Sequence, residues 1–191
     1  MWDVIFPAFL FVIGVAIPYS YRSRRARGQS WTRQAMHAFI RGAILYALGD
    51  LIVSYGSGTL QTNFPVVLQK IGVCYVLAFL ILRLHPGLQV GVAVLLLLIH
   101  TAAYLLHGGD AGDPWARGQN AGHYFQVNWL HLPVRNGNTA LNAITGTVNV
   151  IFGILCGRFL QSERSSTIKF GCMLFAGAAV TAAGWVLATR I

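Results

Sequence analysis

Long uninterrupted apolar segments constrain the fold of this chain more than any other feature. A transmembrane helix needs about 20 predominantly apolar residues, because it must cross a hydrocarbon layer about 30 Å thick. Windows of about that length occur at residues 4–20, 35–55, 64–84, 88–106, 139–160 and 170–189. The alternating pattern of a membrane β-barrel does not explain an apolar run such as residues 92–99. The sequence therefore predicts an all-α, polytopic integral membrane protein with about six transmembrane helices.

The distribution of charge supports the same class of protein. The chain is 55% hydrophobic and 10% charged, with a formal net charge of +9, whereas soluble domains carry about 25% charged residues. A protein that binds nucleic acid would need its basic residues on a continuous surface stripe. Here the basic residues form short clusters between apolar runs. We therefore expect the chain to lie in a lipid bilayer and to bind no nucleic acid.

We interpret residues 1–191 as a single transmembrane domain with one long loop, residues 107–138. The aromatic residues of this loop, Trp115 and Trp129, indicate a segment that packs at the membrane interface. Its histidines lack the spacing of a zinc site, so no metal is expected. The three cysteines lie within apolar runs and are expected to act as small buried hydrophobic residues.

The basic residues also predict the orientation of the chain, because cytoplasmic loops of membrane proteins carry an excess of Lys and Arg. Placing the first, third and fifth connections in the cytoplasm puts nine positive charges inside and three outside. The amino terminus and the loop 107–138 then lie outside. The inside residues are Arg22, Arg24, Arg25, Arg27, Arg33, Arg83, Arg158, Arg164 and Lys169, and the outside residues are Arg117, Arg135 and Arg190.

Polar residues within the predicted spans gather at one depth. Asp3, Asp50, Gln69, Lys70 and His100 all lie toward the outer ends of their helices. Ionisable groups inside a membrane are costly and usually functional. We expect a shared outward-facing pocket in which Asp50 or Asp3 lies close to Lys70. The alternative is that Asp50 and Lys70 simply neutralise each other.

Other features of the spans have structural explanations. Arg41 lies near the cytoplasmic end of its span and can extend its charge toward water. The basic loop 22–33 would attract anionic lipid or the phosphates of a nucleotide cofactor, but the orientation rule already accounts for it. Gly153 and Gly157 form a G-x-x-x-G pattern, which predicts close helix packing.

Two motifs carry a resemblance to a known family. Residues 2–20 read W-D-V-I-F-P-A-F-L-F-V-I-G-V-A-I-P-Y-S, residues 64–78 read F-P-V-V-L-Q-K-I-G-V-C-Y-V-L-A, and residues 151–157 give a weaker third match. Together they resemble the heparan-alpha-glucosaminide N-acetyltransferase family and its bacterial relatives. The first two motifs are fairly specific in combination, and the order of the spans extends the similarity over most of the chain.

The resemblance implies an enzyme of the bacterial inner membrane. Such an enzyme takes acetyl from cytoplasmic acetyl-CoA and delivers it to an amino sugar on the outer side. Asp3 matches the aspartate that begins the family's first motif. In the family this aspartate lies beside a catalytic histidine, so Asp3 is the expected catalytic residue. Gln69 matches the family's glutamine, and Lys70 stands where arginine is usual. Asp50, Gln69, Lys70 and His100 are the expected substrate-binding residues.

The resemblance also implies that the family's catalytic histidine precedes Met1. We therefore expect an internal fragment, truncated at both ends, that lacks this histidine. A small transporter domain and a non-catalytic membrane scaffold are the alternatives. A transporter predicts charged residues near the bilayer centre and repeated halves, whereas the charges here lie toward one face and the halves do not repeat. We prefer the enzyme, and a homo-oligomer is compatible with all three.

Overall fold

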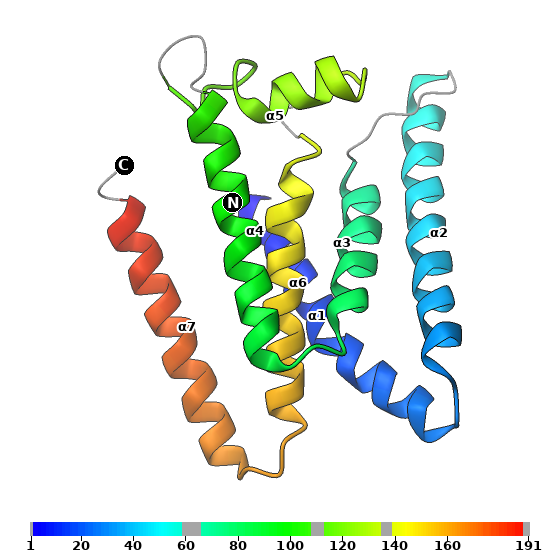
Figure 1. Cartoon of the computed structure of the whole chain (residues 1–191), viewed down its shortest axis with the longest axis vertical. Coiled ribbons are helices and arrows are strands. Elements are labelled where there is room, and N and C mark those ends of the chain that lie inside the picture. The colour runs from blue at the N-terminus through cyan, green and yellow to red at the C-terminus, as the bar shows by residue number, and fades with distance from the viewer. Residues whose placement is uncertain (1, 59–65, 108–112, 135–138, 189–191) are drawn as a thin grey trace. The chain divides into compact units, whose positions relative to one another are not determined.

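The computed structural model describes residues 2–58, 66–107, 113–134 and 139–188 (Figure 1). Within these ranges the chain forms helices joined by turns, with no strand. The all-α prediction is therefore confirmed. The elements are α1 (Trp2–Ala26), α2 (Trp31–Ser57), α3 (Val67–Ile81), α4 (Pro86–His107), α5 (Ala121–Tyr124), the π-helix η1 (Phe125–Trp129), α6 (Asn142–Leu160) and α7 (Ser166–Ala188).

Most of these helices have the length and composition of membrane spans. Among the described residues, five helices are long and apolar enough to cross a membrane: α1, α2, α4, α6 and α7. The remaining predicted span, residues 64–84, contains the shorter apolar helix α3. Val66 has an extended backbone at the start of α3 and the Gln69 side chain accepts a hydrogen bond from its N–H, so the helix begins at Val67.

The chain forms two compact units, Met1–Gly157 and Arg158–Ile191. In the second unit, the Lys169 ammonium donates a hydrogen bond to the Leu160 carbonyl oxygen at 2.8 Å. The Arg164 guanidinium lies 5.8 Å from the centre of the Phe159 ring. These contacts stabilise the turn that leads into α7. The candidate sites described below all belong to the first unit.

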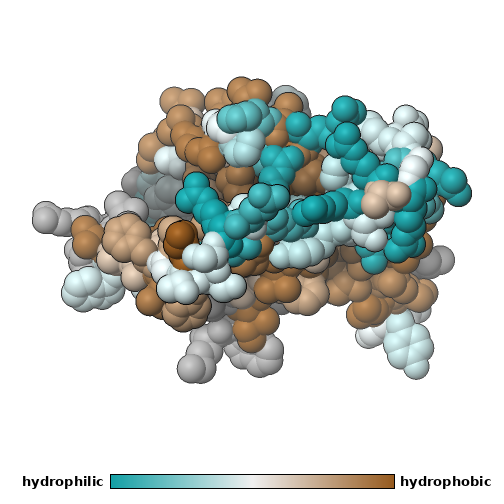
Figure 2. Space-filling view, turned by 90° about the horizontal axis from the view of Figure 1, so that it is seen from below, coloured by the Kyte–Doolittle hydropathy of each residue, from teal (hydrophilic) through white to brown (hydrophobic). Residues whose placement is uncertain are grey.

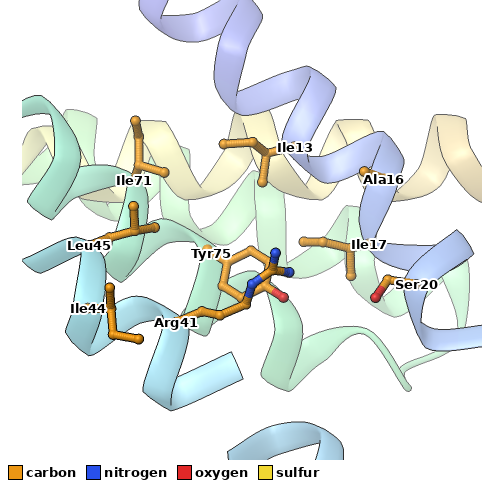
Figure 3. A pocket seen from close by; sticks show the side chains of 9 residues that line it. All are labelled: Ile13, Ala16, Ile17, Ser20, Arg41, Ile44, Leu45, Ile71 and Tyr75. Carbon is orange, nitrogen blue, oxygen red and sulfur yellow. The ribbon is translucent and has the colours of Figure 1, made fainter. Parts of the chain in front are cut away.

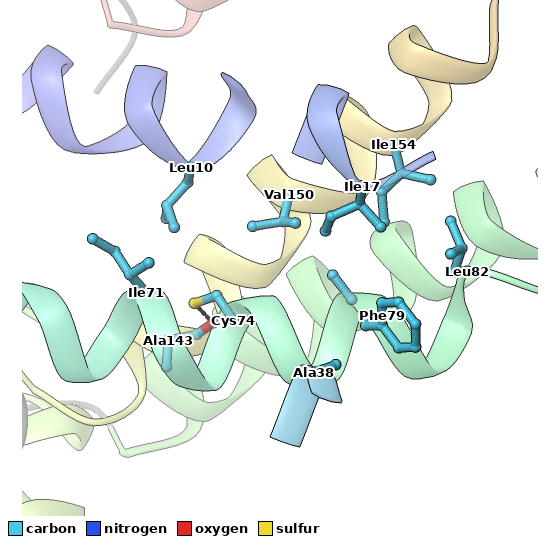
Figure 4. Close-up of a cluster of buried hydrophobic side chains, with 11 residues drawn as sticks. Leu10, Ile17, Ala38, Ile71, Cys74, Phe79, Leu82, Ala143, Val150 and Ile154 are labelled. Atoms are coloured by element: carbon cyan, nitrogen blue, oxygen red, sulfur yellow. Dashed lines mark hydrogen bonds between the residues drawn. The ribbon is translucent and has the colours of Figure 1, made fainter. Parts of the chain in front are cut away.

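The core of the first unit joins α1, α3 and α6 (Figure 4). Leu10 and Ile17 of α1, Cys74 of α3, and Val150 and Ile154 of α6 are almost fully buried. The Cys74 thiol donates a hydrogen bond to the Ala143 carbonyl oxygen at 3.3 Å. Cys74 thus fills space as a small buried residue. The prediction of buried thiols holds for Cys74 alone, because Cys156 is only partly buried and Cys172 is exposed.

Glycines allow α1 and α6 to cross closely. A Cβ atom at Gly153 would collide with the carbonyl oxygen of Phe11 and lie 2.8 Å from the Cα of Gly14. A Cβ at Gly157 would lie 3.2 Å from the Cα of Val15. The close packing predicted for the G-x-x-x-G pattern is confirmed.

The two ends of the first unit differ in character. We call the end formed by residues 20–34 and the α3–α4 turn the basic end. Seen from below, it gathers hydrophilic side chains (Figure 2). Here Trp31 stacks on Phe79 with ring centres 5.0 Å apart, and the Arg83 guanidinium lies 5.4 Å from the Trp31 ring. These contacts join the start of α2 to the end of α3.

The opposite end carries a folded segment between α4 and α6 (Figure 1). Gln126 of η1 is fully buried; its Nε2 donates to the Pro133 carbonyl oxygen at 2.8 Å, and its Oε1 accepts from the Ala140 N–H at 2.9 Å. Trp115 stacks on Tyr104 of α4 with ring centres 4.9 Å apart. The described part of the loop 107–138 is therefore folded, whereas its place at the membrane interface stays a prediction.

Candidate functional site

Residues of helices α1, α2 and α3 line a partly open cavity of about 460 Å³ (Figure 3). This volume is in the range of small-molecule sites. Its walls are mainly aliphatic, and its polar groups are a hydroxyl, a phenol and a guanidinium. The lining residues are Ile13, Ala16, Ile17, Ser20, Arg41, Ile44, Leu45, Ile71 and Tyr75.

Arg41 gives this cavity its charge. It lies about 15 Å along the axis of α2 from Trp31, at about 1.5 Å per residue. Arg41 and Tyr75 both line the cavity (Figure 3), and the Arg41 side chain is exposed. No carboxylate of the described residues pairs with it. The sequence predicted only that Arg41 extends its charge toward water. Its place in the wall of this cavity was not predicted, although a cation well inside an apolar segment was a signal for it.

A second, polar pocket lies at the basic end. It has a volume of about 280 Å³ and is lined by Ser20, Ser23, Arg24, Arg27 and Gln29. Ser20 also lines the Arg41 cavity, so the two spaces adjoin. The Arg27 guanidinium donates to the Ser23 hydroxyl oxygen at 3.2 Å. The Gln29 Oε1 is buried, and it has no hydrogen-bond partner among the described residues.

Two of the predicted site residues meet at the opposite end. The Gln69 Nε2 donates a hydrogen bond to the Asp50 Oδ1 at 2.6 Å, which joins α3 to α2. Gln69 is fully buried, and its Oε1 accepts from the Val66 N–H at 2.8 Å. Asp50 is partly exposed. The carboxylate is thus held by a buried neighbour and remains accessible.

Lys70 points into the unit rather than toward lipid. It is 3% exposed, and its ammonium lies 5.4 Å from the centre of the Phe6 ring. The predicted catalytic residue Asp3 belongs to α1, but its side chain lies outside the described residues. The pairing of Lys70 with a carboxylate therefore stays a prediction.

His100 makes no described contact with the Asp50–Gln69 pair. Its ring packs on Tyr104 with centres 4.7 Å apart, and its Nε2 is enclosed without a hydrogen-bond partner among the described residues. No described hydrogen bond or ring contact joins it to Asp50, Gln69 or Lys70. In the same described ranges, no three His, Cys, Asp or Glu side chains converge on a point where they could hold a metal ion.

The first unit thus has two chemically different ends. The basic end offers guanidinium and hydroxyl groups to an anion, next to an aliphatic cavity. The opposite end offers an accessible carboxylate to a cation or a hydrogen-bond donor. A family model described as heparan-alpha-glucosaminide N-acetyltransferase, catalytic, matches residues 1–133, which is more than half of the chain. A comparison with curated proteins gives no match.

Proposed function

The chain belongs to the heparan-alpha-glucosaminide N-acetyltransferase family, and we propose that it forms part of a membrane-bound acetyltransferase. This enzyme takes acetyl from acetyl-CoA in the cytoplasm and transfers it to the amino group of a sugar on the outer side of the membrane. The observation that carries the proposal is the family match over residues 1–133. The different chemistry of the two ends supports it.

The basic end suits the donor. Coenzyme A combines a phosphorylated nucleotide with a long, thin arm that ends in the thioester. Arg24 and Arg27 would bind the phosphates, because guanidinium groups form strong charge-assisted hydrogen bonds with phosphate. The arm would enter the adjoining Arg41 cavity, whose walls are mainly aliphatic.

The opposite end suits the acceptor, and we assign Asp50, Gln69, Lys70 and His100 to this site. In the reaction the neutral amine attacks the thioester carbonyl, a C–N bond forms, and the C–S bond breaks. A base takes the proton of the amine, and the departing thiolate takes up a proton. Asp3 would orient an imidazole that serves as this base. We propose that the amino terminus and the Asp50 end face outward, in the inner membrane of a bacterium.

Binding of acetyl-CoA to the purified protein in lipid nanodiscs tests the donor site. The double variant Arg24→Gln/Arg27→Gln should weaken binding at least about tenfold, because hydrogen bonds to charged groups contribute about 1.5–3 kcal/mol each. The matched control is Arg22→Gln/Arg25→Gln, which removes the same charge from the same segment outside the pocket. An equal loss of acetyl-CoA affinity in both double variants would mean that the net charge of the segment determines binding, and it would contradict a donor site in this pocket. Absence of binding to the wild type would refute the donor site.

A transporter remains the competing class, and a transport assay separates the two. Transporter sites are formed by discontinuous helices near the bilayer midplane, whereas α2, α3 and α4 run without interruption through the described residues. If the protein exchanges radiolabelled glucosamine across vesicles without acetyl-CoA, and no N-acetylglucosamine forms, the transporter is favoured.

A further inference from the structure

We propose that Gln69 is a positioning residue that fixes the Asp50 carboxylate as the binding group for the ammonium of the acceptor. The sequence grouped both residues as substrate-binding, but their surroundings differ. Gln69 is 0% exposed and cannot touch a ligand, whereas Asp50 is partly exposed. This inference rests on the acetyl-acceptor function proposed above and assigns a separate task to each residue.

The orientation of the Gln69 amide is fixed by chemistry. Its Oε1 accepts from the backbone N–H of Val66 at 2.8 Å. A backbone N–H can only donate, so the amide oxygen must face it and the NH₂ group must face α2. The NH₂ group therefore donates to the Asp50 Oδ1 at 2.6 Å. One carboxylate oxygen is thus held as a hydrogen-bond acceptor at a defined place.

Gly49 provides the space that this arrangement needs. A Cβ atom at Gly49 would lie 2.8 Å from the Cγ of Gln69 and 3.4 Å from its Cδ. Any larger residue at position 49 would push Gln69 away from α2. The neighbouring glycine therefore lets a buried amide reach the carboxylate from the next helix.

The Asp50 carboxylate keeps capacity for a ligand. A carboxylate can accept about four hydrogen bonds, and the Gln69 amide supplies one of them. The Tyr46 phenol on the same helix also interacts electrostatically with the Asp50 carboxylate. Gln69 is neutral, so it orients the carboxylate without cancelling its charge. No described group of three metal-ligating side chains accompanies Asp50. A molecular cation with N–H donors, such as a protonated primary amine, matches this site.

The experiment compares three sugars that differ at one position. Glucosamine carries the ammonium, N-acetylglucosamine carries a neutral amide, and glucose carries a hydroxyl. Ligand-induced thermal stabilisation of the protein in nanodiscs measures each affinity. Glucosamine should bind the wild type with the highest affinity, and its binding should fall as pH rises through the pKa of its own amine. Asp50→Asn should weaken glucosamine binding about tenfold or more and remove this pH dependence.

Two variants test the positioning role without altering Asp50. Gln69→Met removes the donor, and Gly49→Ala displaces Gln69 while leaving its chemistry intact. Both should weaken glucosamine binding about three- to tenfold and leave acetyl-CoA affinity unchanged. The matched controls are Gln89→Met, which alters another fully buried glutamine at the basic end, and Gly91→Ala, whose Cβ meets open space. Neither control should change the affinity for glucosamine.

The outcomes separate this inference from the function on which it rests. Equal binding of glucosamine and N-acetylglucosamine would overturn the ammonium site. Wild-type glucosamine affinity in both Gln69→Met and Gly49→Ala would overturn the positioning role. If the wild type binds glucosamine through Asp50 but does not bind acetyl-CoA, the proposed donor function fails and the ammonium site stands.

Discussion

Three glutamines, Gln69, Gln89 and Gln126, are fully buried, and each hydrogen-bonds with backbone groups near helix ends. Gln69 binds the Val66 N–H, Gln89 donates to the carbonyl oxygens of Ile81 and Leu82, and Gln126 joins Pro133 to Ala140. Backbone groups left without partners away from water are costly. These amides satisfy such groups where a helix ends inside the unit.

Gln126→Leu should loosen the segment between α4 and α6. The change leaves the Ala140 N–H and the Pro133 carbonyl without their present partner, at a cost of about 1–3 kcal/mol for each buried group. Limited proteolysis from the outer side should cut residues 113–134 faster than in the wild type. Gln119→Leu, an exposed change in the same segment, is the control. Equal cleavage rates in the variant and the wild type would contradict this account.

The sequence indicated some of these residues and missed others. Asp50 and Lys70 were identified because a charge in an apolar run is conspicuous, and Gln69 because it lies within a family motif. Gln89 and Gln126 carry no charge and follow no fixed spacing, so their roles appear only when their backbone partners are placed. Arg41 was visible as a charge, but its cavity depends on how three helices pack.

At the scale of elements, hydrophobic length predicted the helices well and their ends less well. The first window ended at residue 20, yet α1 continues to Ala26, because its basic residues keep a helical backbone beyond the apolar segment. The window at residues 64–84 was longer than α3, because the Gln69 side chain fixes the helix start at Val67. The length of an apolar segment predicts which residues can lie in the membrane, whereas the residues at which a helix begins and ends depend on capping.

The α1–α6 crossing gives a prediction at this scale. Gly14→Ala should destabilise the protein by about 1–3 kcal/mol or more, because the added Cβ would collide with the Val150 carbonyl oxygen and no flexible side chain can yield. Thermal unfolding in detergent, followed by circular dichroism, measures the loss. Faster labelling of the buried Cys74 thiol should accompany it. Gly91→Ala is the control, and equal stability of the two variants would show that the crossing tolerates a methyl group.

At the scale of the whole molecule, orientation is the first property to test. The excess of nine positive charges over three predicts that the basic end faces the cytoplasm and that residues 107–138 lie outside. Single cysteines at positions 25 and 120 should differ in their reaction with an impermeant maleimide added to intact cells. Position 120 should be labelled and position 25 protected, after the native cysteines are replaced. Labelling at position 25 but not at position 120 would reverse the proposed sidedness.

Transfer of acetyl across a sealed membrane tests the central claim most directly. The protein is produced from its whole gene and reconstituted into vesicles with the basic end outward, as determined by the labelling above. Glucosamine is sealed inside, and radiolabelled acetyl-CoA is added outside. We predict labelled N-acetylglucosamine inside the vesicles, with a rate that falls at least about tenfold in Arg24→Gln/Arg27→Gln. Labelled product that forms only when both substrates are on the same side, or no labelled product at all, would contradict the proposed function.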